Sequence, residues 1–265
     1  MHGKSIGWGI KDKERVLFYI ESALFFCYTS FMKFTIELAN KTIRIHSLYD
    51  EVYEMCKGYY VEDEKVDFEV ISTQDLIDQE KDHLPFPDSY LETVSIYRQI
   101  IEKMLDYSTF MMHGSVLASD RKHAFMFTAP SGTGKTTHTN LWLQNCPSAF
   151  VVNGDKPLLK VEGNQVLAYG TPWSGKERMN TNCCVPLKAI VILERGEKNR
   201  MEEIRFTSRV PFLLEQIYRP KNRLGLRKTL RLVEQLSKHV KVYRYISNNF
   251  LDDAFSCTYD VLKSL

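Results

Sequence analysis

The chain has 265 residues, of which 44% are hydrophobic and 26% are charged, and its formal net charge at pH 7 is +2. This length allows one large core, or a main domain with a small one, and the composition excludes a disordered or fibrous protein. So small a net charge gives no reason to expect nucleic acid or a membrane surface as a partner. Six cysteines lack the C-x-x-C spacing of metal sites and redox pairs, which indicates reduced thiols in a cytoplasmic protein.

The first 31 residues contain an apolar run at 16–31. Glu21 interrupts the run, which is shorter than the roughly 20 residues needed to span a bilayer, and no small-residue cleavage site follows. A strand-like segment begins at Met32. The hypothesis is that Met32 is the natural initiator and that residues 1–31 are an N-terminal extension that is not native.

Residues 32–87 are predicted to form a small, β-rich subdomain. Apolar and polar residues alternate at 34–38 and 42–46 on either side of Ala39-Asn-Lys, which predicts a hairpin. Prolines mark the end of this region, and the spacing of Ser89 and Glu92 then predicts a capping box at the start of a helix.

Residues 88–265 are predicted to form a larger α/β domain, because short apolar runs alternate with helical or turn segments. Strands are expected at 115–118, 124–128, 150–152, 189–193 and 240–246. A basic helix that opens at Pro220 is expected to bury Leu226, Leu230 and Val233, leaving its charges free to approach an acidic peptide or another subunit.

A phosphate-binding loop follows the buried run at 124–128. The segment Ala129-Pro-Ser-Gly-Thr-Gly-Lys135-Thr136 leads into a helical stretch, which is the strand, loop and helix context that the G-x-x-x-x-G-K-[ST] motif requires. Alanine replaces the first glycine of the motif. Gly132 and Gly134 permit the tight backbone that turns successive amides toward phosphate oxygens.

Within this loop, Lys135 is expected to reach the β and γ phosphates, and the Thr136 hydroxyl is expected to bind Mg²⁺. The sequence therefore predicts binding of ATP with Mg²⁺ through Ala129, Pro130, Ser131, Gly132, Thr133, Gly134, Lys135, Thr136 and Thr137.

Asp155 ends a second apolar run, at 149–153, which would place its carboxylate beside the phosphate loop. There it could bind Mg²⁺, directly or through water, or accept the proton of an attacking hydroxyl. The alternative is that it only caps a turn with Gly154. His113 precedes another strand, and a lone histidine in such a place is more often structural.

A loop at 171–178 supplies two cations, Lys176 and Arg178, beside Gly175. Such a loop suits closure over a transferring phosphate. The alternative is that both cations are simply exposed on a turn.

Three segments together resemble the catalytic domain of the HPr kinase/phosphorylase family. They are Met112-His-Gly-Ser-Val-Leu, Phe127-Thr-Ala-Pro-Ser-Gly-Thr-Gly-Lys-Thr-Thr and Asn153-Gly-Asp, within a match over about residues 110–260. The same order of loop and Gly-Asp occurs in phosphoenolpyruvate carboxykinases. The resemblance implies an α/β fold: a phosphoenolpyruvate carboxykinase-like P-loop core with a small, mostly β N-terminal subdomain.

The resemblance also implies an activity, the transfer of the γ phosphate of ATP to a serine hydroxyl. Asp155 would be the catalytic base, His113 would lie close to the phosphates, and Lys135 would hold them. Lys176 and Arg178 would belong to the catalytic loop. Lys156 stands where the family has a second acid, so phosphorolysis is not implied. The resemblance further favours a homo-oligomer.

The favoured hypothesis is an ATP-dependent kinase acting on a hydroxyl of a protein, a peptide or a small molecule. The missing second acid instead favours an ATP-sensing accessory module that transfers no phosphate. A phosphoenolpyruvate carboxykinase-like decarboxylation is a third alternative, but 265 residues leave little room for the larger substrate domain of that family.

Overall fold

The structure is a computed structural model that describes residues 32–62, 65–81 and 86–265; the predicted N-terminal extension, residues 1–31, lies outside this part. The described residues form a mixed α/β protein, as predicted, and none of their helices is long and apolar enough to cross a membrane.

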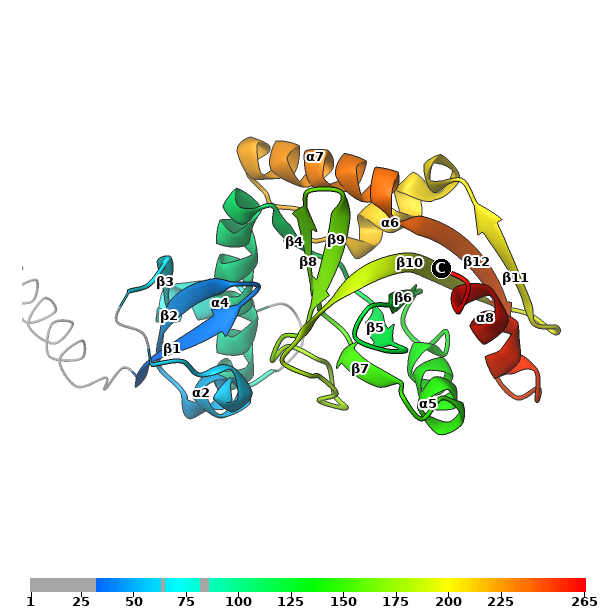
Figure 1. The fold of residues 1–265 in the computed structure, drawn as a ribbon. Helices are drawn as coiled ribbons and strands as arrows, with labels where there is room; N and C mark the ends of the chain where they lie inside the picture. The colour runs from blue at the N-terminus through cyan, green and yellow to red at the C-terminus, as the bar shows by residue number, and fades with distance from the viewer. Residues whose placement is uncertain (1–31, 63–64, 82–85) are drawn as a thin grey trace, which may run out of the picture.

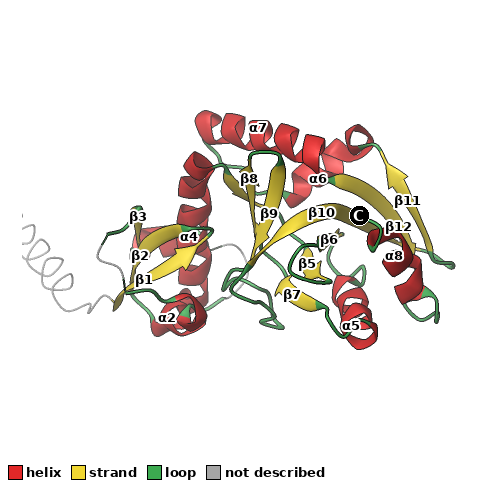
Figure 2. Ribbon diagram, viewed as in Figure 1, coloured by secondary structure: helices red, strands yellow, loops and turns green. Residues whose placement is uncertain are grey.

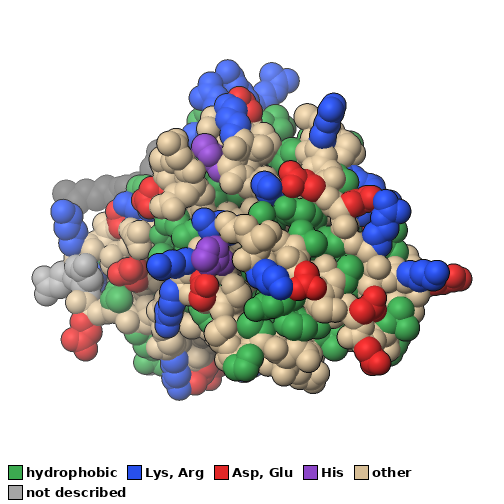
Figure 3. All heavy atoms as spheres, turned by 45° about the vertical axis from the view of Figure 1, so that its right-hand side comes forward, with side chains coloured by type: hydrophobic (Ala, Val, Ile, Leu, Met, Phe, Trp, Pro, Cys, Tyr) green, Lys and Arg blue, Asp and Glu red, His purple; other side chains and the backbone are tan. Residues whose placement is uncertain are grey.

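The surface charge is mixed on the face shown in Figure 3. Basic and acidic side chains are intermixed there with apolar ones and do not form a large patch of one charge.

The N-terminal unit contains, within the described residues, a three-stranded sheet with the order β1-β2-β3. Strands β1 (Met32–Leu38) and β2 (Lys41–Ser47) form the predicted antiparallel hairpin. Ala39 and Asn40 both have positive φ, 49° and 61°, as a two-residue turn of the hairpin type requires. The unit also contains β3 (Phe68–Ile71), α2 (Asp50–Met55), a 3₁₀ turn, η1 (Lys57–Tyr59), and α3 (Gln74–Asp78).

Helix α4 (Asp88–Met104) lies between this small sheet and the rest of the molecule (Figure 1). A second 3₁₀ turn, η2 (Leu105–Tyr107), follows it. One continuous apolar core joins Ile43 and Ile45 of the small sheet, Ile96 and Ile100 of α4, and Trp173 of a later loop. The N-terminal unit is therefore packed onto the larger unit through α4.

The predicted capping box at Ser89 and Glu92 is wrong. Helix α4 begins at Asp88 with Pro87 as the preceding residue, and Ser89 makes no cap. The buried Glu92 carboxylate accepts hydrogen bonds from the backbone amides of Leu48, at 2.6 Å, and Tyr49, at 3.0 Å. A tertiary contact with the chain just before α2 has replaced the local one.

The larger unit is built, within the described residues, on a nine-stranded sheet (Figure 2). Its path is β4-β8-β9-β10-β6-β5-β7, with β12 paired to β10 and β11 paired to β12. The strands are β4 (Thr109–Met111), β5 (Ser115–Ala118), β6 (Ala124–Thr128), β7 (Phe150–Asn153), β8 (Leu158–Glu162), β9 (Gln165–Tyr169), β10 (Cys184–Arg195), β11 (Arg200–Ile204) and β12 (Lys241–Ser247).

The long strand β10 lies in the middle of the sheet and pairs with three other strands. Its first residues, 184–186, pair antiparallel with β9, whereas residues beyond Leu187 run parallel to β6 on one side and to β12 on the other. Nearly every residue from Leu187 to Leu193 is buried, as expected for a strand covered on both faces.

Helices cover both faces of this sheet. Along β6, Phe125 and Phe127 point to a core that includes Trp142 of α5 (Lys135–Asn145) and Leu262 of α8 (Ala254–Leu262). Met126 belongs to the core on the opposite face, which includes residues of α6 (Val210–Gln216) and α7 (Arg223–His239). Successive side chains of β6 therefore point to opposite faces of the sheet. The end of β6, and the loop that follows it, lie between the layer of α5 and α8 and the layer of α6 and α7.

The buried face of α7 agrees with the predicted one only at Val233. Leu226 and Leu230 are 36% and 45% exposed, and the helix packs Leu232 and Leu236, together with Val233, against the sheet. Both sets have helical spacing, so the choice between them depends on what the helix packs against.

The burial of the Glu92 carboxylate between α4 and the chain before α2 can be tested by the pH dependence of stability. Burial is the largest influence on Glu92 and raises its pKa, against the lowering effect of the hydrogen bond from the Leu48 amide. A carboxyl with a raised pKa stabilises the fold below its unfolded pKa of about 4.3 and loses that contribution as the pH rises through the folded value. Urea unfolding of the wild type and Glu92→Gln, followed from about pH 4 to pH 7, should show a stability difference that becomes less favourable to the wild type as the pH rises. A difference that grows in favour of the wild type with pH would contradict this environment for Glu92.

Candidate active site

The predicted phosphate loop lies between a strand and a helix, as the sequence indicates. Strand β6 ends at Thr128, and α5 begins at Lys135 with Gly134 as its capping residue. Gly132 and Gly134 have φ of 77° and 115°, in the region that favours glycine. A Cβ at Gly134 would also lie 2.9 Å from Nδ2 of Asn249 and would displace the end of that side chain, so the need for glycine here is mainly conformational.

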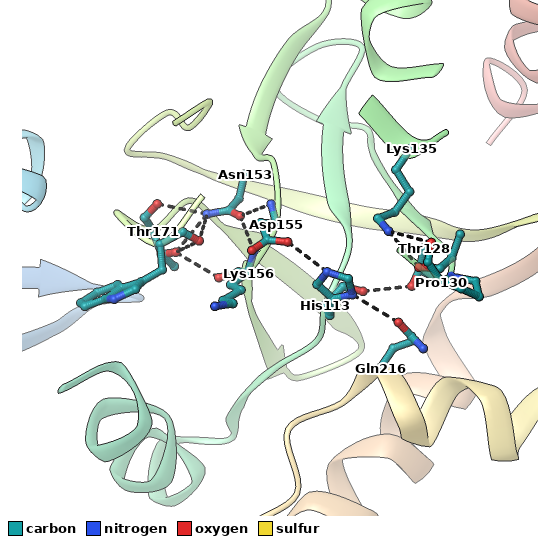
Figure 4. Close-up of polar contacts among 11 residues, drawn as sticks. His113, Thr128, Pro130, Lys135, Asn153, Asp155, Lys156, Thr171 and Gln216 are labelled. Carbon is teal, nitrogen blue, oxygen red and sulfur yellow. Dashed lines mark hydrogen bonds and ion pairs between the residues drawn. The ribbon is translucent and has the colours of Figure 1, made fainter. Parts of the chain in front are cut away.

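The Lys135 amine lies over its own loop. Nζ donates to the carbonyl oxygens of Ala129, at 2.8 Å, and Pro130, at 3.4 Å (Figure 4). Burial lowers the pKa of Lys135, and the nearby Asp155 opposes this effect. A triphosphate would offer this amine anionic oxygens in place of two neutral carbonyls.

Asp155 and His113 are in contact. His113 Nε2 lies 3.0 Å from Asp155 Oδ1, and its Nδ1 lies 3.3 Å from Oε1 of Gln216 (Figure 4). The backbone supports the pair, because the amide of Gly114 donates to the Asp155 carbonyl and the Thr128 hydroxyl donates to the His113 carbonyl, both at 2.9 Å. His113 is therefore tied to Asp155 and to the end of β6, which was not evident from the sequence.

The charge state of Asp155 follows from these neighbours. Burial acts to raise the pKa of this carboxyl, but the hydrogen bond and charge of His113, with Lys156 and Lys135, outweigh it and hold the pKa below its ordinary value. Asp155 is consequently a carboxylate at neutral pH and can accept a hydrogen bond or bind a cation.

Asn153 fixes the position of Asp155. Its side-chain oxygen accepts from the amides of Asp155, at 2.8 Å, and Lys156, at 2.7 Å. Its side-chain nitrogen donates to the carbonyl and hydroxyl of Thr171, at 3.0 and 2.9 Å, and lies 3.4 Å from the Trp173 carbonyl. The fully buried Asn153 thus joins the turn after β7 to the start of the 171–178 loop.

The 171–178 loop is anchored on α4. The Trp173 ring stacks on Tyr97 with ring centroids 4.2 Å apart, and its Nε1 donates to the Thr93 carbonyl at 2.8 Å. Gly175 has φ of 80° and faces the Asp155 side chain so closely that an added Cβ would lie 3.0 Å from the Cβ of Asp155. The loop backbone at Gly175 therefore packs against the Asp155 side chain.

These parts surround a cavity of about 460 Å³. Of the predicted site residues, it is lined by Ser131, Gly132, Gly134, Lys135, Thr136, Thr137, His113, Asp155 and Lys176. Ala129, Pro130 and Thr133 are not in its wall; the first two offer carbonyls to Lys135, and the Thr133 hydroxyl donates to the Pro130 carbonyl. Arg178 lies apart from this cavity and lines a neighbouring one.

The donors of this cavity suit a hard cation that also binds phosphate. The Thr136 hydroxyl and the Asp155 carboxylate line the same space. Among the residues that the structure describes, no group of three or more His, Cys, Asp or Glu side chains could hold a metal. This donor set fits Mg²⁺, which is commonly bound by one or two carboxylates together with substrate phosphates.

Several residues of the site escaped prediction. Asn153 and Gln216 position Asp155 and His113, and Asn249 donates to the Gly134 carbonyl at 3.3 Å. Arg195, at the end of β10, donates to the Gly132 carbonyl. Apart from Asn153, whose place before Gly-Asp is an ordinary turn signal, these residues lie far along the chain from the groups that they contact.

Comparisons with known proteins leave the family open. No protein-family model and no curated protein matches the sequence. Among solved structures, the Hpr(Ser) kinase/phosphatase from Coxiella burnetii matches with 13% sequence identity and a TM-score of 0.33, covering 58% of this chain and 94% of that chain. A likeness of that size decides neither family nor activity, so the chemistry follows from the residues of the site.

The Asn153 side chain offers a direct test of how the site is held. Asn153→Ala would leave the partly buried amides of Asp155 and Lys156 without their acceptor and the buried Thr171 carbonyl without its donor, and an orphaned buried group costs about 1–3 kcal/mol. We expect the free energy of unfolding, measured with urea, to fall by about 2 kcal/mol or more. Asn182→Ala, which removes only the exposed bond to the Gly58 carbonyl, is the control and should change it by no more than about 0.5 kcal/mol. Equal effects would contradict the role given to Asn153.

Proposed function

We propose that this protein is an ATP-dependent phosphotransferase that moves the γ-phosphoryl group of ATP to a hydroxyl. The observation that supports it is a single cavity lined by the phosphate loop, Lys135, and the Asp155–His113 pair. A loop for triphosphate and a carboxylate in one cavity supply the two requirements of phosphoryl transfer, which are positioning and charge stabilisation.

In the proposed reaction, the acceptor oxygen attacks the γ phosphorus, and the bond from that phosphorus to the β,γ-bridging oxygen breaks. The hydroxyl proton passes to the Asp155 carboxylate, and ADP leaves with the bridging oxygen. His113 holds the carboxylate in place through its 3.0 Å contact and keeps it ionised before the transfer. An ionised carboxylate within reach of the attacking hydroxyl is what a general base requires.

The other groups stabilise charge. Lys135 would leave the Ala129 and Pro130 carbonyls to bind the β and γ phosphate oxygens, and the first amides of α5 would face the same anion. Mg²⁺, held by the Thr136 hydroxyl and, through water, by Asp155, would neutralise charge on the phosphates and leave the Asp155 carboxylate able to accept the proton. Lys176, which lines the same cavity, would bind the phosphoryl group in transfer.

This proposal keeps the sequence resemblance to HPr kinase-like proteins, including their phosphoenolpyruvate carboxykinase-like core, as its framework. The acceptor is a hydroxyl of a protein, peptide or small molecule, and assembly into a homo-oligomer stays a prediction. Lys156 occupies the position after Asp155 and lines a second cavity and not the phosphate cavity. The reverse phosphorolysis is therefore no part of the proposal.

A sensing module that binds ATP without transferring phosphate is the second candidate. The single observation that favours it is Lys156, because the phosphate cavity then has one aspartate, Asp155, instead of two adjacent acids. The two candidates differ in whether the γ-phosphoryl group of ATP is transferred to another molecule, which γ-labelled ATP can measure.

Asp155→Asn separates catalysis from binding. The amide keeps the shape of the side chain but cannot accept the proton, so we expect phosphoryl transfer to fall by about 10² or more. The measurement is incubation with γ-labelled ATP, Mg²⁺ and candidate hydroxyl acceptors, alongside the Kd for ATP, which should change little. Equal losses in transfer and in ATP binding would make Asp155 a metal ligand only; label that never moves, although ATP binds, would favour the sensing module.

Lys135→Ala tests the phosphate loop itself. We expect the affinity for ATP to fall by about tenfold or more and transfer to disappear, because the side chain supplies the positive charge that faces the β and γ phosphates. Calorimetric titration with ATP and Mg²⁺ measures the first effect. Lys122→Ala, which removes an exposed lysine outside the site, is the control and should bind as the wild type does. Retained transfer in Lys135→Ala would contradict the placement of ATP.

A further inference from the structure

A second cavity, of about 740 Å³, adjoins the phosphate cavity. The two share four residues: Asp155, Ser174, Gly175 and Lys176. Asp155, the proposed base, therefore faces two spaces, one lined by the phosphate loop and one that the phosphate loop does not line. An acceptor hydroxyl has to reach Asp155 and the γ phosphate from a side that ATP does not occupy, and the second cavity provides that side.

The N-terminal unit builds the far wall of this cavity. Helices α2 and the start of α4 contribute Glu51, Glu54, Met55, Tyr90, Thr93 and Val94. A partly buried hydrogen bond joins this unit to the chain after the 171–178 loop: Tyr59 Oη donates to Asn180 Oδ1 at 2.8 Å. The N-terminal unit is thus part of the site.

Charge is divided along the second cavity. At the junction lies Lys176, which lines both cavities, and Lys156 and Arg178 line the second. The α2 wall carries two carboxylates, Glu51 and Glu54, of which Glu54 also pairs with Lys57. The cations suit the transferring phosphate, whereas the carboxylates suit a cationic group on the part of the acceptor that lies away from the reacting hydroxyl.

We propose that the second cavity is the acceptor site and that it selects a hydroxyl compound carrying a cationic group that faces Glu51 and Glu54. This inference rests on the proposed phosphotransferase function and narrows its acceptor. A volume of about 740 Å³ admits a ligand much larger than one amino acid, so a serine in a basic peptide segment fits as well as a large hydroxylated amine.

The test measures acceptor binding separately from transfer. Fluorescent serine peptides, one flanked by lysines and one by glutamates, are titrated with the protein in Mg²⁺ and ATP, and phosphorylation of both is followed with γ-labelled ATP. Unlabelled amino alcohols compete with the peptides to distinguish a small-molecule acceptor from a peptide. The variants are Glu51→Gln/Glu54→Gln and a matched control, Glu37→Gln/Asp75→Asn, which removes two exposed carboxylates of the same unit outside the cavity.

We expect the basic peptide, or a cationic amino alcohol, to bind about five- to tenfold more tightly than its acidic or neutral counterpart, the range that two partly exposed charge pairs supply. The Glu51→Gln/Glu54→Gln variant should lose this preference and keep its affinity for ATP; the control variant should retain both. Binding with the expected preference but without movement of label would uphold the second cavity as a binding site for cationic hydroxyl compounds and reject the phosphotransferase, so that it could no longer be called an acceptor site. Phosphorylation without any preference for cationic acceptors, a preference that survives in Glu51→Gln/Glu54→Gln, or no binding of any cationic hydroxyl compound would overturn the inference.

Discussion

The hydrogen bonds of one buried side chain, Asn153, connect the turn that carries Asp155 with the loop at 171–178. With its oxygen it fixes the turn that presents Asp155, and with its nitrogen it fixes the start of the 171–178 loop. That loop is in turn anchored on α4 through Trp173, so the position of the carboxylate depends on the packing of the N-terminal unit. Because the polar groups of Asn153 are all buried, the network is costly to break and therefore rigid.

The Asp155 side chain is held rigidly, whereas the Lys135 amine in the same cavity can change its partners. The Lys135 amine is held by carbonyls of its own loop, which are weak partners for an ammonium compared with phosphate oxygens. Asp155, by contrast, is fixed by His113 and by the backbone of Gly114. A site with a preset carboxylate and a cation that can change partners suits a ligand that brings its own negative charge.

The sequence predicts what depends on local chemistry. The phosphate loop follows from two glycines with positive φ between an apolar strand and a helix, and Asp155 follows from its place after a buried strand. Contacts between distant segments could not be predicted. Glu92 has the spacing of a cap but binds amides before α2, and packing decides that α7 buries Leu232 and Leu236 beside Val233, in place of Leu226 and Leu230. The second cavity depends on how α2 meets the 171–178 loop, which no local pattern encodes.

The most direct test of the account is amide hydrogen exchange with and without ATP and Mg²⁺, which needs no acceptor. The account predicts that ATP and Mg²⁺ slow exchange at 130–137 and at 174–179 together, because both segments line the phosphate cavity, and that AMP does so weakly or not at all. Exchange unchanged in both segments, or protection confined to other parts of the chain, would contradict the claim that this cavity binds a triphosphate.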